Sequence, residues 1–293
     1  AEPAAPNGGS REGDALVARV LATLESWPNV ASQFRQLLRV GDAPLTGMGE
    51  YWQQGIGNQR KTCWQWQTMV GGDRAVFIQV LDKNSCVWTD VRRPDKRTVT
   101  RVDLKRLRRD LALAPDAAGQ GRGVENIDEL EQLARGGLSQ LVAELRRAFA
   151  FGPPSVVVEH GRSLTAVVGR WKPEALERVW PGLSDAAPGD WPSHLPHHVV
   201  IKAGQADFFP YAIEYRRGTD AALVNRAEGA SDPLALYEFF NVRWQVTMPD
   251  RLFEFDQAEL DWRDVTAEEL ERVRPAPRVL PAEVAERPGT WRL

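Results

Sequence analysis

The chain has 293 residues and a net charge of −3, with 43% hydrophobic and 26% charged residues. This balance is typical of a globular protein with ample material for a core. It argues against a general binder of nucleic acid, which would carry a clear basic excess. No run of about 18 apolar residues occurs, so we expect no helix that spans a membrane. The unusual feature is tryptophan, with 11 copies.

The N-terminal residues 1–13 are rich in Ala, Pro and Gly, a composition typical of a flexible leader. Because the chain begins with Ala1 rather than Met, we expect that a signal for export or lipid anchoring was removed, which would place the protein in the periplasm or cell envelope. The first regular element is an amphipathic helix predicted over 14–25, where apolar residues recur at helical spacing.

After this helix the apolar pattern changes to a period of two residues, which indicates half-buried strands. Short turns rich in Gly, Asp and Asn separate six such segments, and connections this short favour an antiparallel meander. The predicted strands lie at about 30–39, 45–54, 62–70, 75–82, 86–92 and 97–102.

A helical insertion is predicted in the middle of the chain, at about 103–150. It begins with a short basic helix over 103–113 and continues with a flexible loop at 117–123. A long helix follows over 126–149, and its apolar stripe includes Leu130, Leu133, Leu138 and Leu141.

Two adjacent glycines, Gly136 and Gly137, interrupt this long helix at a cost of about 1 kcal/mol each relative to alanine. We interpret the helix as a lid that is hinged at these glycines, and we expect alanine at both positions to stabilise it. The alternative is a helix that packs against the sheet as a fixed wall.

The second half of the chain returns to strands. A short helix at 173–180 and a loop rich in Pro and Trp at 181–196 separate them. The predicted strands are 155–160, 163–169, 198–203, 208–217, 234–247 and 252–256. We therefore expect a single domain over 14–270, followed by a Pro-rich tail at 271–293.

Charge is distributed unevenly along the chain. Residues 92–109 contain nine Lys or Arg against two Asp, a local charge of +7, whereas 250–287 contain eleven acids against six Arg, a local charge of −5. We expect the two segments to face each other, or to be solvated surface.

The stretch TCWQWQTMVGGDRAVFIQVLDKNSCVWTDV at 62–91 places aromatic residues on three successive strands. Turns at Gly72–Asp73 and at Lys83–Asn84 would set the pairing of these strands. A slip of one residue would separate the aromatic residues, because side chains alternate between the two faces. In the predicted register, one face carries Trp64, Trp66, Phe77, Leu81 and Trp88.

The same register places the two cysteines, Cys63 and Cys86, on opposite faces of the sheet. A disulfide requires α-carbons within about 7 Å of each other. We therefore expect two free, buried cysteines, with a disulfide as the less favoured alternative.

Several segments resemble the LolA/LolB/LppX superfamily of lipoprotein carriers and lipid-binding envelope proteins. They are GEYWQQG at 49–55, VFIQVLDKNSCVWT at 76–89 and TRVDLKRL at 100–107. The late stretch LYEFFNVRWQVTMPDRLFEF at 236–255 is similar to the closing strands of that family. The resemblance covers about 14–266, but the functional arginine of the carriers has no match in this chain.

The resemblance implies an α+β fold in which a curved antiparallel half-barrel sheet binds acyl chains on a concave side covered by helices. The implied partner is a lipid or the acyl chain of a lipoprotein, bound by a monomer that contacts a membrane surface, without a cofactor. Aromatic side chains offer a lipid tail a large apolar area. The predicted ligand-binding residues are Trp64, Trp66, Phe77, Leu81, Trp88, Phe240 and Trp244, and the predicted lid residues are Leu130, Leu133, Gly136, Gly137, Leu138 and Leu141.

Other interpretations stay open. The aromatic residues would equally form an ordinary core, or an envelope module that binds glycan or protein through surface Trp without an internal cavity. No nucleophile, metalloprotease, phosphate-loop or dinucleotide motif occurs, and His194, His197 and His198 lack a second ligand cluster. Acidic residues on late strands would suit a carboxylate pair or a solvated face: Glu214, Glu238 and Glu254. We predict a non-catalytic binding protein without a metal.

Overall fold

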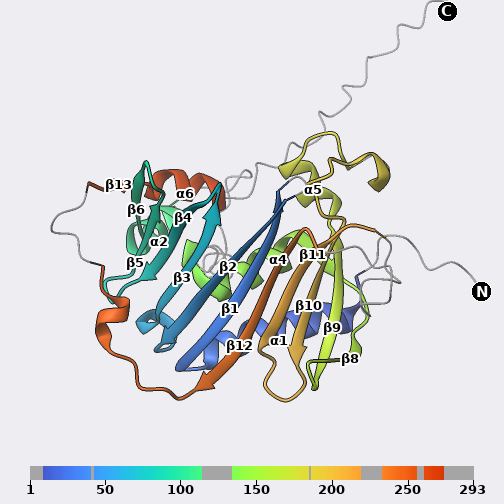
Figure 1. Ribbon diagram of the computed structural model, residues 1–293, viewed down its shortest axis with the longest axis horizontal. Coiled ribbons are helices and arrows are strands. Elements are labelled where there is room, and N and C mark those ends of the chain that lie inside the picture. The colour runs from blue at the N-terminus through green and yellow to red at the C-terminus, as the bar shows by residue number, and fades with distance from the viewer. Residues whose placement is uncertain are drawn as a thin grey trace, which may run out of the picture.

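The computed structural model describes residues 9–40, 43–113, 134–184, 186–218, 233–255 and 261–273. Its centre is one sheet of 13 strands, open rather than closed into a barrel, with helices packed behind it in the view of Figure 1. The predicted α+β class, a half-barrel sheet with helices on one side, is confirmed.

Two antiparallel meanders make up this sheet. The first contains β1 (Asn29–Val40), β2 (Ala43–Gln54), β3 (Lys61–Val70), β4 (Asp73–Leu81), β5 (Cys86–Arg92) and β6 (Arg97–Asp103). The second contains β7 (Phe149–Phe151), β8 (Ser155–Glu159), β9 (Arg162–Trp171), β10 (His198–Gly204), β11 (Pro210–Arg216) and β12 (Ala235–Trp244). Short turns between successive strands explain the antiparallel pairing of the first meander, as the sequence predicts, whereas longer connections join β9 to β10 and β11 to β12 in the second.

The two meanders join through the pairing of β1 with β12, where Phe34 lies opposite Phe239. At the far edge of the first meander, β13 (Arg263–Asp264) adds to β6 in the parallel direction. The first strand of the chain therefore lies in the middle of the sheet, next to one of the last.

The described helices are α1 (Arg11–Ser26), α2 (Leu104–Leu113), α4 (Gly137–Ala148), α5 (Pro173–Val179) and α6 (Thr266–Val273). None of them is long and apolar enough to cross a membrane.

Two predicted elements differ from the structure. Within the described residues the helix expected over 126–149 is broken at Arg135 and Gly136 and resumes as α4 at Gly137, and the expected strand at 252–256 is instead a 3-10 turn, Asp250–Phe253. The predicted loop at 117–123 lies outside the described residues, as do residues 274–293 of the tail predicted over 271–293, whereas 271–273 belong to α6.

One face of the sheet, which we call the inner face, packs against α1, α2 and α4. On the sheet side, Phe34, Tyr51, Trp64 and Leu81 are buried there. The helices contribute Val17, Val20, Leu24, Leu107, Leu138, Val142 and Leu145. These residues form the main core of the protein.

The opposite face, which we call the outer face, carries a second and smaller core. The segment that follows β12 crosses this face and brings apolar side chains onto it (Figure 1). The cluster includes Cys63, Val80, Cys86, Trp88, Met248 and Phe253.

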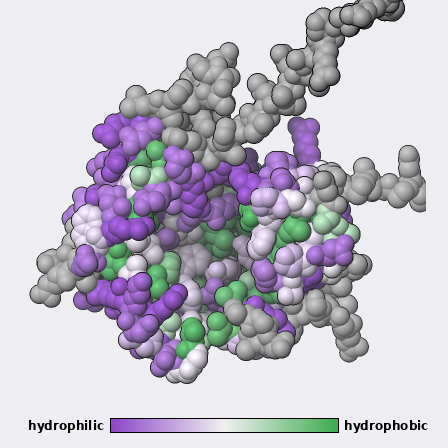
Figure 2. Space-filling model, turned by 90° about the horizontal axis from the view of Figure 1, so that it is seen from above, coloured by the Kyte–Doolittle hydropathy of each residue, from purple (hydrophilic) through white to green (hydrophobic). Residues whose placement is uncertain are grey.

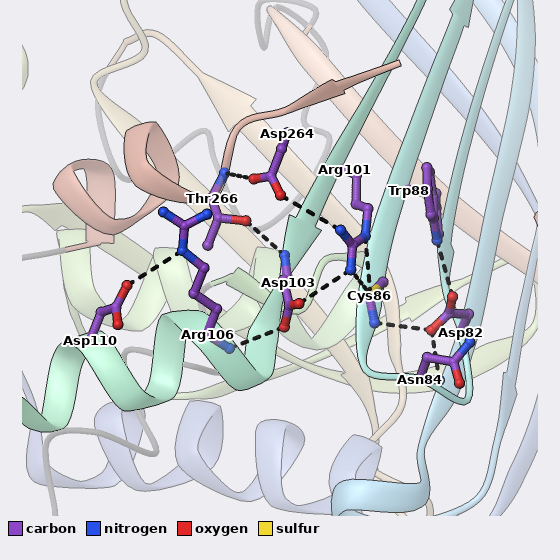
Figure 3. A network of polar contacts seen from close by, with 10 residues as sticks. All are labelled: Asp82, Asn84, Cys86, Trp88, Arg101, Asp103, Arg106, Asp110, Asp264 and Thr266. Atoms are coloured by element: carbon purple, nitrogen blue, oxygen red, sulfur yellow. Dashed lines mark hydrogen bonds and ion pairs between the residues drawn. The ribbon is translucent and has the colours of Figure 1, made fainter. Parts of the chain in front are cut away.

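The acidic C-terminal segment lies against the basic stretch, as the charge pattern predicts. Arg101 lies 3.2 Å from Asp103 and 3.6 Å from Asp264, and the Thr266 hydroxyl accepts a hydrogen bond of 2.9 Å from the Asp103 backbone (Figure 3). These contacts link β6, β13 and the start of α6. On the other side of the outer face, Lys61 pairs with Asp250 at 2.7 Å.

A buried glutamine attaches α1 to the sheet. The Gln53 side chain is 0% exposed, and its amide donates to the carbonyl oxygens of Leu24 and Trp27 at 2.7 and 2.8 Å. Its own oxygen accepts a hydrogen bond from the Tyr51 hydroxyl at 2.8 Å. Two carbonyls at the end of the helix are thus satisfied from within the core, where water does not reach them.

Replacing Gln53 by Ala should lower the free energy of unfolding by about 2–4 kcal/mol, because two carbonyls and a hydroxyl lose their buried partners. Urea titration followed by circular dichroism measures the change. The matched control is Gln67→Ala on the exposed side of β3, whose side chain contacts Arg74 and whose loss should cost under about 0.5 kcal/mol. Equal stability of the two variants would contradict this role of Gln53.

Candidate functional site

The strands of the first meander have two distinguishable ends. The tip end carries the turns at 71–72 and 93–96, and the base end carries the connection at 55–60. In Figure 1 the tip end points upward, α1 crosses behind the base end, and α4 crosses above α1.

The pairing of β3 with β4 differs from the predicted register by two residues. Gly71 and Gly72, with φ of +62° and +93°, form the turn, so that Trp64 lies opposite Gln79 and Trp66 opposite Phe77. A shift of two residues leaves every side chain on its predicted face. The predicted grouping of Trp64, Trp66, Phe77 and Leu81 on one face therefore holds, and that face is the inner one.

The pairing of β4 with β5 differs by one residue, and this changes the face of Trp88. Trp88 lies opposite Val80 instead of Gln79. Both are on the outer face, so the predicted register was wrong here and Trp88 does not join Trp64 and Trp66.

The cause of this shift is a longer turn organised by Asp82. Its carboxylate accepts hydrogen bonds from the backbone of Asn84 at 2.7 Å and of Cys86 at 3.0 Å, and Ser85 adopts a φ of +63° (Figure 3). The same carboxylate accepts the Trp88 indole N–H at 3.0 Å. Trp88 is 1% exposed and stacks on Phe255 at 5.1 Å, so it is part of the outer core.

The register also corrects the placement of the cysteines. Cys63 and Cys86 both lie in the outer core and both are free. Burial raises the pKa of the Cys63 thiol to about 12, so this side chain acts as a small apolar residue at neutral pH.

Burial on the inner face changes along the strands. Trp64 is 7% exposed and contacts Phe34 and Tyr51 with ring centroids at 5.0 and 5.5 Å. One step toward the tip end, Trp66 and Phe77 stack on each other at 5.8 Å but remain only half-buried. The strands β3 and β4 thus contribute core residues at the base end and accessible aromatic surface at the tip end.

The start of α4 marks where this change occurs. The Gly137 backbone N–H donates to the Gln79 side chain at 2.9 Å, and Gln79 lies in the same row as Trp64. The row of Trp66 and Phe77 lies beyond the helix. Figure 2, which looks onto the tip end, shows a hollow with hydrophobic residues inside and hydrophilic residues around it.

The two predicted residues on β12 lie elsewhere. Phe240 is opposite Gln33, next to an irregularity in β1, and it lines a pocket on the outer face. Trp244 contacts Trp27 at 3.8 Å and Phe209 at 5.3 Å, at the base end. The structure therefore does not bring Phe240 and Trp244 together with Trp66.

Polar residues that we did not predict accompany the accessible aromatic pair. Gln36 of β1 donates a hydrogen bond of 2.9 Å to the hydroxyl of Tyr237 on β12, and both side chains face inward. Burial raises the pKa of the Tyr237 hydroxyl, which therefore stays protonated. The signal in the sequence is the alternation in LYEFF, where Tyr237 and Phe239 face the core and Glu238 does not.

The structure also corrects the interpretation of the predicted lid. Gly136 and Gly137 have φ of +78° and +75°, and the helical conformation is lost at Arg135 and Gly136 before α4 begins at Gly137. Leu138 is fully buried and Leu141 is partly buried against the core, whereas Leu130 and Leu133 lie outside the described residues. A lid that moves stays a prediction, but the expected gain from alanine is wrong.

Alanine at Gly136 or at Gly137 should lower the free energy of unfolding by about 1–2 kcal/mol each, because L-residues disfavour this left-handed backbone conformation. At Gly136 the added methyl group would also lie 2.4 Å from the Gln79 side-chain oxygen. Thermal or urea unfolding measures the change. Gly189→Ala, at a position with open space and no positive φ, is the matched control and should be nearly neutral. Stabilised variants at 136 or 137 would contradict this.

No group of three potential metal-binding side chains occurs in the described part of the chain. Glu214 is buried between Lys202 and Arg216, and Glu238 pairs with Arg35 and His160. Glu214 and Glu238 thus take part in separate ion pairs rather than in the carboxylate pair considered from the sequence.

His198 should make stability depend on pH. Burial, with Arg170 and His197 nearby, lowers the pKa of its side chain to about 4 in the folded state, against about 6.5 when unfolded. Between these values the unfolded chain binds a proton that the folded chain does not, so stability falls as pH falls from about 6.5 to about 4. His198→Asn should flatten this part of a plot of urea midpoint against pH, and an unchanged slope would contradict the assignment.

The comparisons with known proteins give structural likenesses only. No protein-family model and no curated protein matches the sequence. Among solved structures, the chain is similar to a DUF1329 family protein from Desulfovibrio piger, at 11% identity, with 85% of this chain and 98% of that chain covered and a TM-score of 0.36.

Two further solved structures are similar to the chain. An outer membrane lipoprotein-sorting protein domain from Vibrio parahaemolyticus matches at 9% identity over 82% of this chain and 95% of that chain, with a TM-score of 0.32. A LolA superfamily protein from Nitrosomonas europaea matches at 9% identity over 84% and 99%, with a TM-score of 0.28. The superfamily that the sequence motifs resemble is thus among the matches. At such TM-scores these solved structures do not indicate which ligand this chain binds.

Proposed function

We propose that the tip end of the inner face binds the acyl chain of a lipid or lipoprotein, and that the protein carries or senses this ligand in the cell envelope without catalysing a reaction. The observation that supports the proposal is the stacked pair Trp66 and Phe77, which is only half-buried although it lies on the inner face of the sheet. The resemblance of the sequence to lipoprotein carriers is the reason for naming an acyl chain and the envelope.

The chemistry of this surface suits a hydrocarbon ligand. Two aromatic rings that lie 5.8 Å apart and 28° from parallel form an apolar platform. Covering such a platform with an acyl chain removes apolar area from water, at about 25 cal/mol per Å². The neighbouring polar groups Gln36 and Tyr237 satisfy each other and so compete little for a ligand.

The aromatic platform is supported by well-packed core residues next to it on the same strand. Trp64 lies directly below Trp66 on β3 and contacts Phe34, Tyr51, Tyr237 and Phe239. These contacts hold β3 in place whether or not a ligand is present. A substitution at Trp66 should therefore affect binding more than folding.

Trp66→Ala should weaken the binding of a fluorescent fatty acid about 5- to 10-fold while costing less than the about 3–5 kcal/mol expected for a fully buried Trp. Titration fluorescence and thermal unfolding measure the two effects. The matched control is Trp52→Ala, which removes a half-buried Trp from the outer face of the neighbouring strand. It should leave the affinity unchanged.

A large thermal loss in Trp66→Ala without any titratable fatty acid would support an ordinary core instead. Organic extraction of the purified protein followed by mass spectrometry provides an independent check, since copurified acyl chains support the proposal. Saturable binding of glycans or proteins, with no acyl chain bound, would favour the envelope interaction module.

A further inference from the structure

A pocket that described residues form on the outer face has a volume of about 450 Å³. Such a volume is in the range of sites for small ligands. The β8–β9 hairpin closes one side of this pocket, and β1, β2, β11 and β12 form the rest. Its lining combines charged and apolar side chains, and the ones used below are Arg35, Met48, Arg162, Leu164, Tyr211 and Phe240.

Two local irregularities shape the pocket. His160 and Gly161, with φ of +50° and +74°, form a tight turn that sets Glu159 opposite Arg162. On β11 the register with β10 shifts by one residue, which leaves Tyr211 as an extra residue at a bulge. Bulges of this kind redirect side chains and are frequent beside functional sites.

The bulge and the turn bring Arg162 and Tyr211 together. The guanidinium of Arg162 lies 3.8 Å from the centre of the Tyr211 ring, and the Tyr211 hydroxyl donates to Asp207 at 2.7 Å. An arginine stacked on a ring keeps its N–H donors at the edge of the guanidinium, where they remain available to a planar anion.

The acids of the pocket already have partners. Glu238 accepts from Arg35 at 2.6 Å and lies 3.1 Å from His160. Glu159, although opposite Arg162 in the hairpin, pairs with Lys202.

Lys202 holds Glu159 firmly because it belongs to a buried ionic chain. It is 0% exposed and also pairs with the buried Glu214, at 2.9 Å, which in turn pairs with Arg216. Turning Glu159 toward Arg162 would leave charge unpaired in the protein interior, at a high cost. Within the described residues Arg162 has no acidic partner, so it is the one cation of the pocket lining without a carboxylate.

We propose that this outer pocket binds an anionic amphiphile: Arg162 holds a carboxylate or phosphate head group, and the apolar body lies against Tyr211, Leu164, Met48 and Phe240. Two features support the apolar part of the assignment. Met48 is 47% exposed at the rim, and Leu164 is buried at the wall. Arg35 and Glu238 face the outer side, because they alternate along their strands with the inward-facing Phe34 and Phe239. The wall of the pocket adjoins the main core, since Phe239 also lines the pocket and Leu164 and Tyr211 belong to that core.

Isothermal titration calorimetry with three probes of one shape tests the proposal. They are 2-naphthoate, 2-naphthyl phosphate and the uncharged 2-naphthalenemethanol. The wild-type protein should bind at least one anion about tenfold or more tightly than the alcohol, since hydrogen bonds to charged groups contribute this much. The anion that binds more tightly tells a carboxylate site from a phosphate site. Absence of saturable binding, or equal binding of the alcohol, overturns the proposal.

Variants locate the site. Arg162→Gln should lose the preference for anions, and Arg162→Lys should keep part of it. The matched control is Arg19→Gln, which removes an exposed arginine that lies over another ring, Phe208, at 3.9 Å outside the pocket. Trp66→Ala should leave naphthyl binding intact. Unchanged anion binding in Arg162→Gln, or its loss in Trp66→Ala, overturns the proposal, and neither result bears on fatty-acid binding at the inner face.

Discussion

A helix that crosses a sheet covers only as much strand as its own width, and this constraint determines which part of the inner face is accessible. Packed helices lie about 8–10 Å apart, so α1 and α4 together cover about 20 Å of strand. Strands of 10 to 12 residues, at about 3.3 Å per residue, are about 33–40 Å long. The same sheet is therefore core beneath the helices and less buried beyond them. The different burial of Trp64 and Trp66, two residues apart on one strand, agrees with this geometry.

The sequence predicted correctly which face of the sheet a side chain occupies wherever the predicted strand register was wrong by an even number of residues. On β3 and β4 the glycine turn shifted the pairing by two residues, and the grouping of Trp64, Trp66 and Phe77 survived. On β5 the pairing shifted by one residue and Trp88 went to the other face, because the Asp82 carboxylate accepts hydrogen bonds from Asn84 and Cys86 and so organises a turn that is one residue longer. The presence of strands, helices and a sheet of this class follows from local patterns. The length of one turn depends on side-chain hydrogen bonds that periodicity does not contain.

Contacts between residues that are far apart in the chain were the other feature that the sequence predicted only in part. Charge complementarity correctly joined the basic and acidic segments, since Arg101 meets Asp264 across more than half of the chain. The spacing of residues in the sequence, however, does not predict that Arg162 of the β8–β9 hairpin lies against Tyr211 at a bulge. It also does not predict that Lys202 pairs with Glu159. The bend at two consecutive glycines was read from the sequence as a flexible point in a helix. Their positive φ values place them at the start of α4 in a conformation that alanine disfavours.

The position of β1 has a consequence for how the protein folds. Arg35 and Glu238, which face each other across the pairing of β1 with β12, are 203 positions apart in the chain. Contacts of such high sequence separation form late and slowly. Until β12 is available, β1 remains a free edge of long, alternating strand, which is a template for pairing with another chain. The exposed edge of β1 is therefore open to such pairing until nearly the whole chain has been synthesised. β12, the strand that finally covers this edge, completes the middle of the sheet rather than one of its edges.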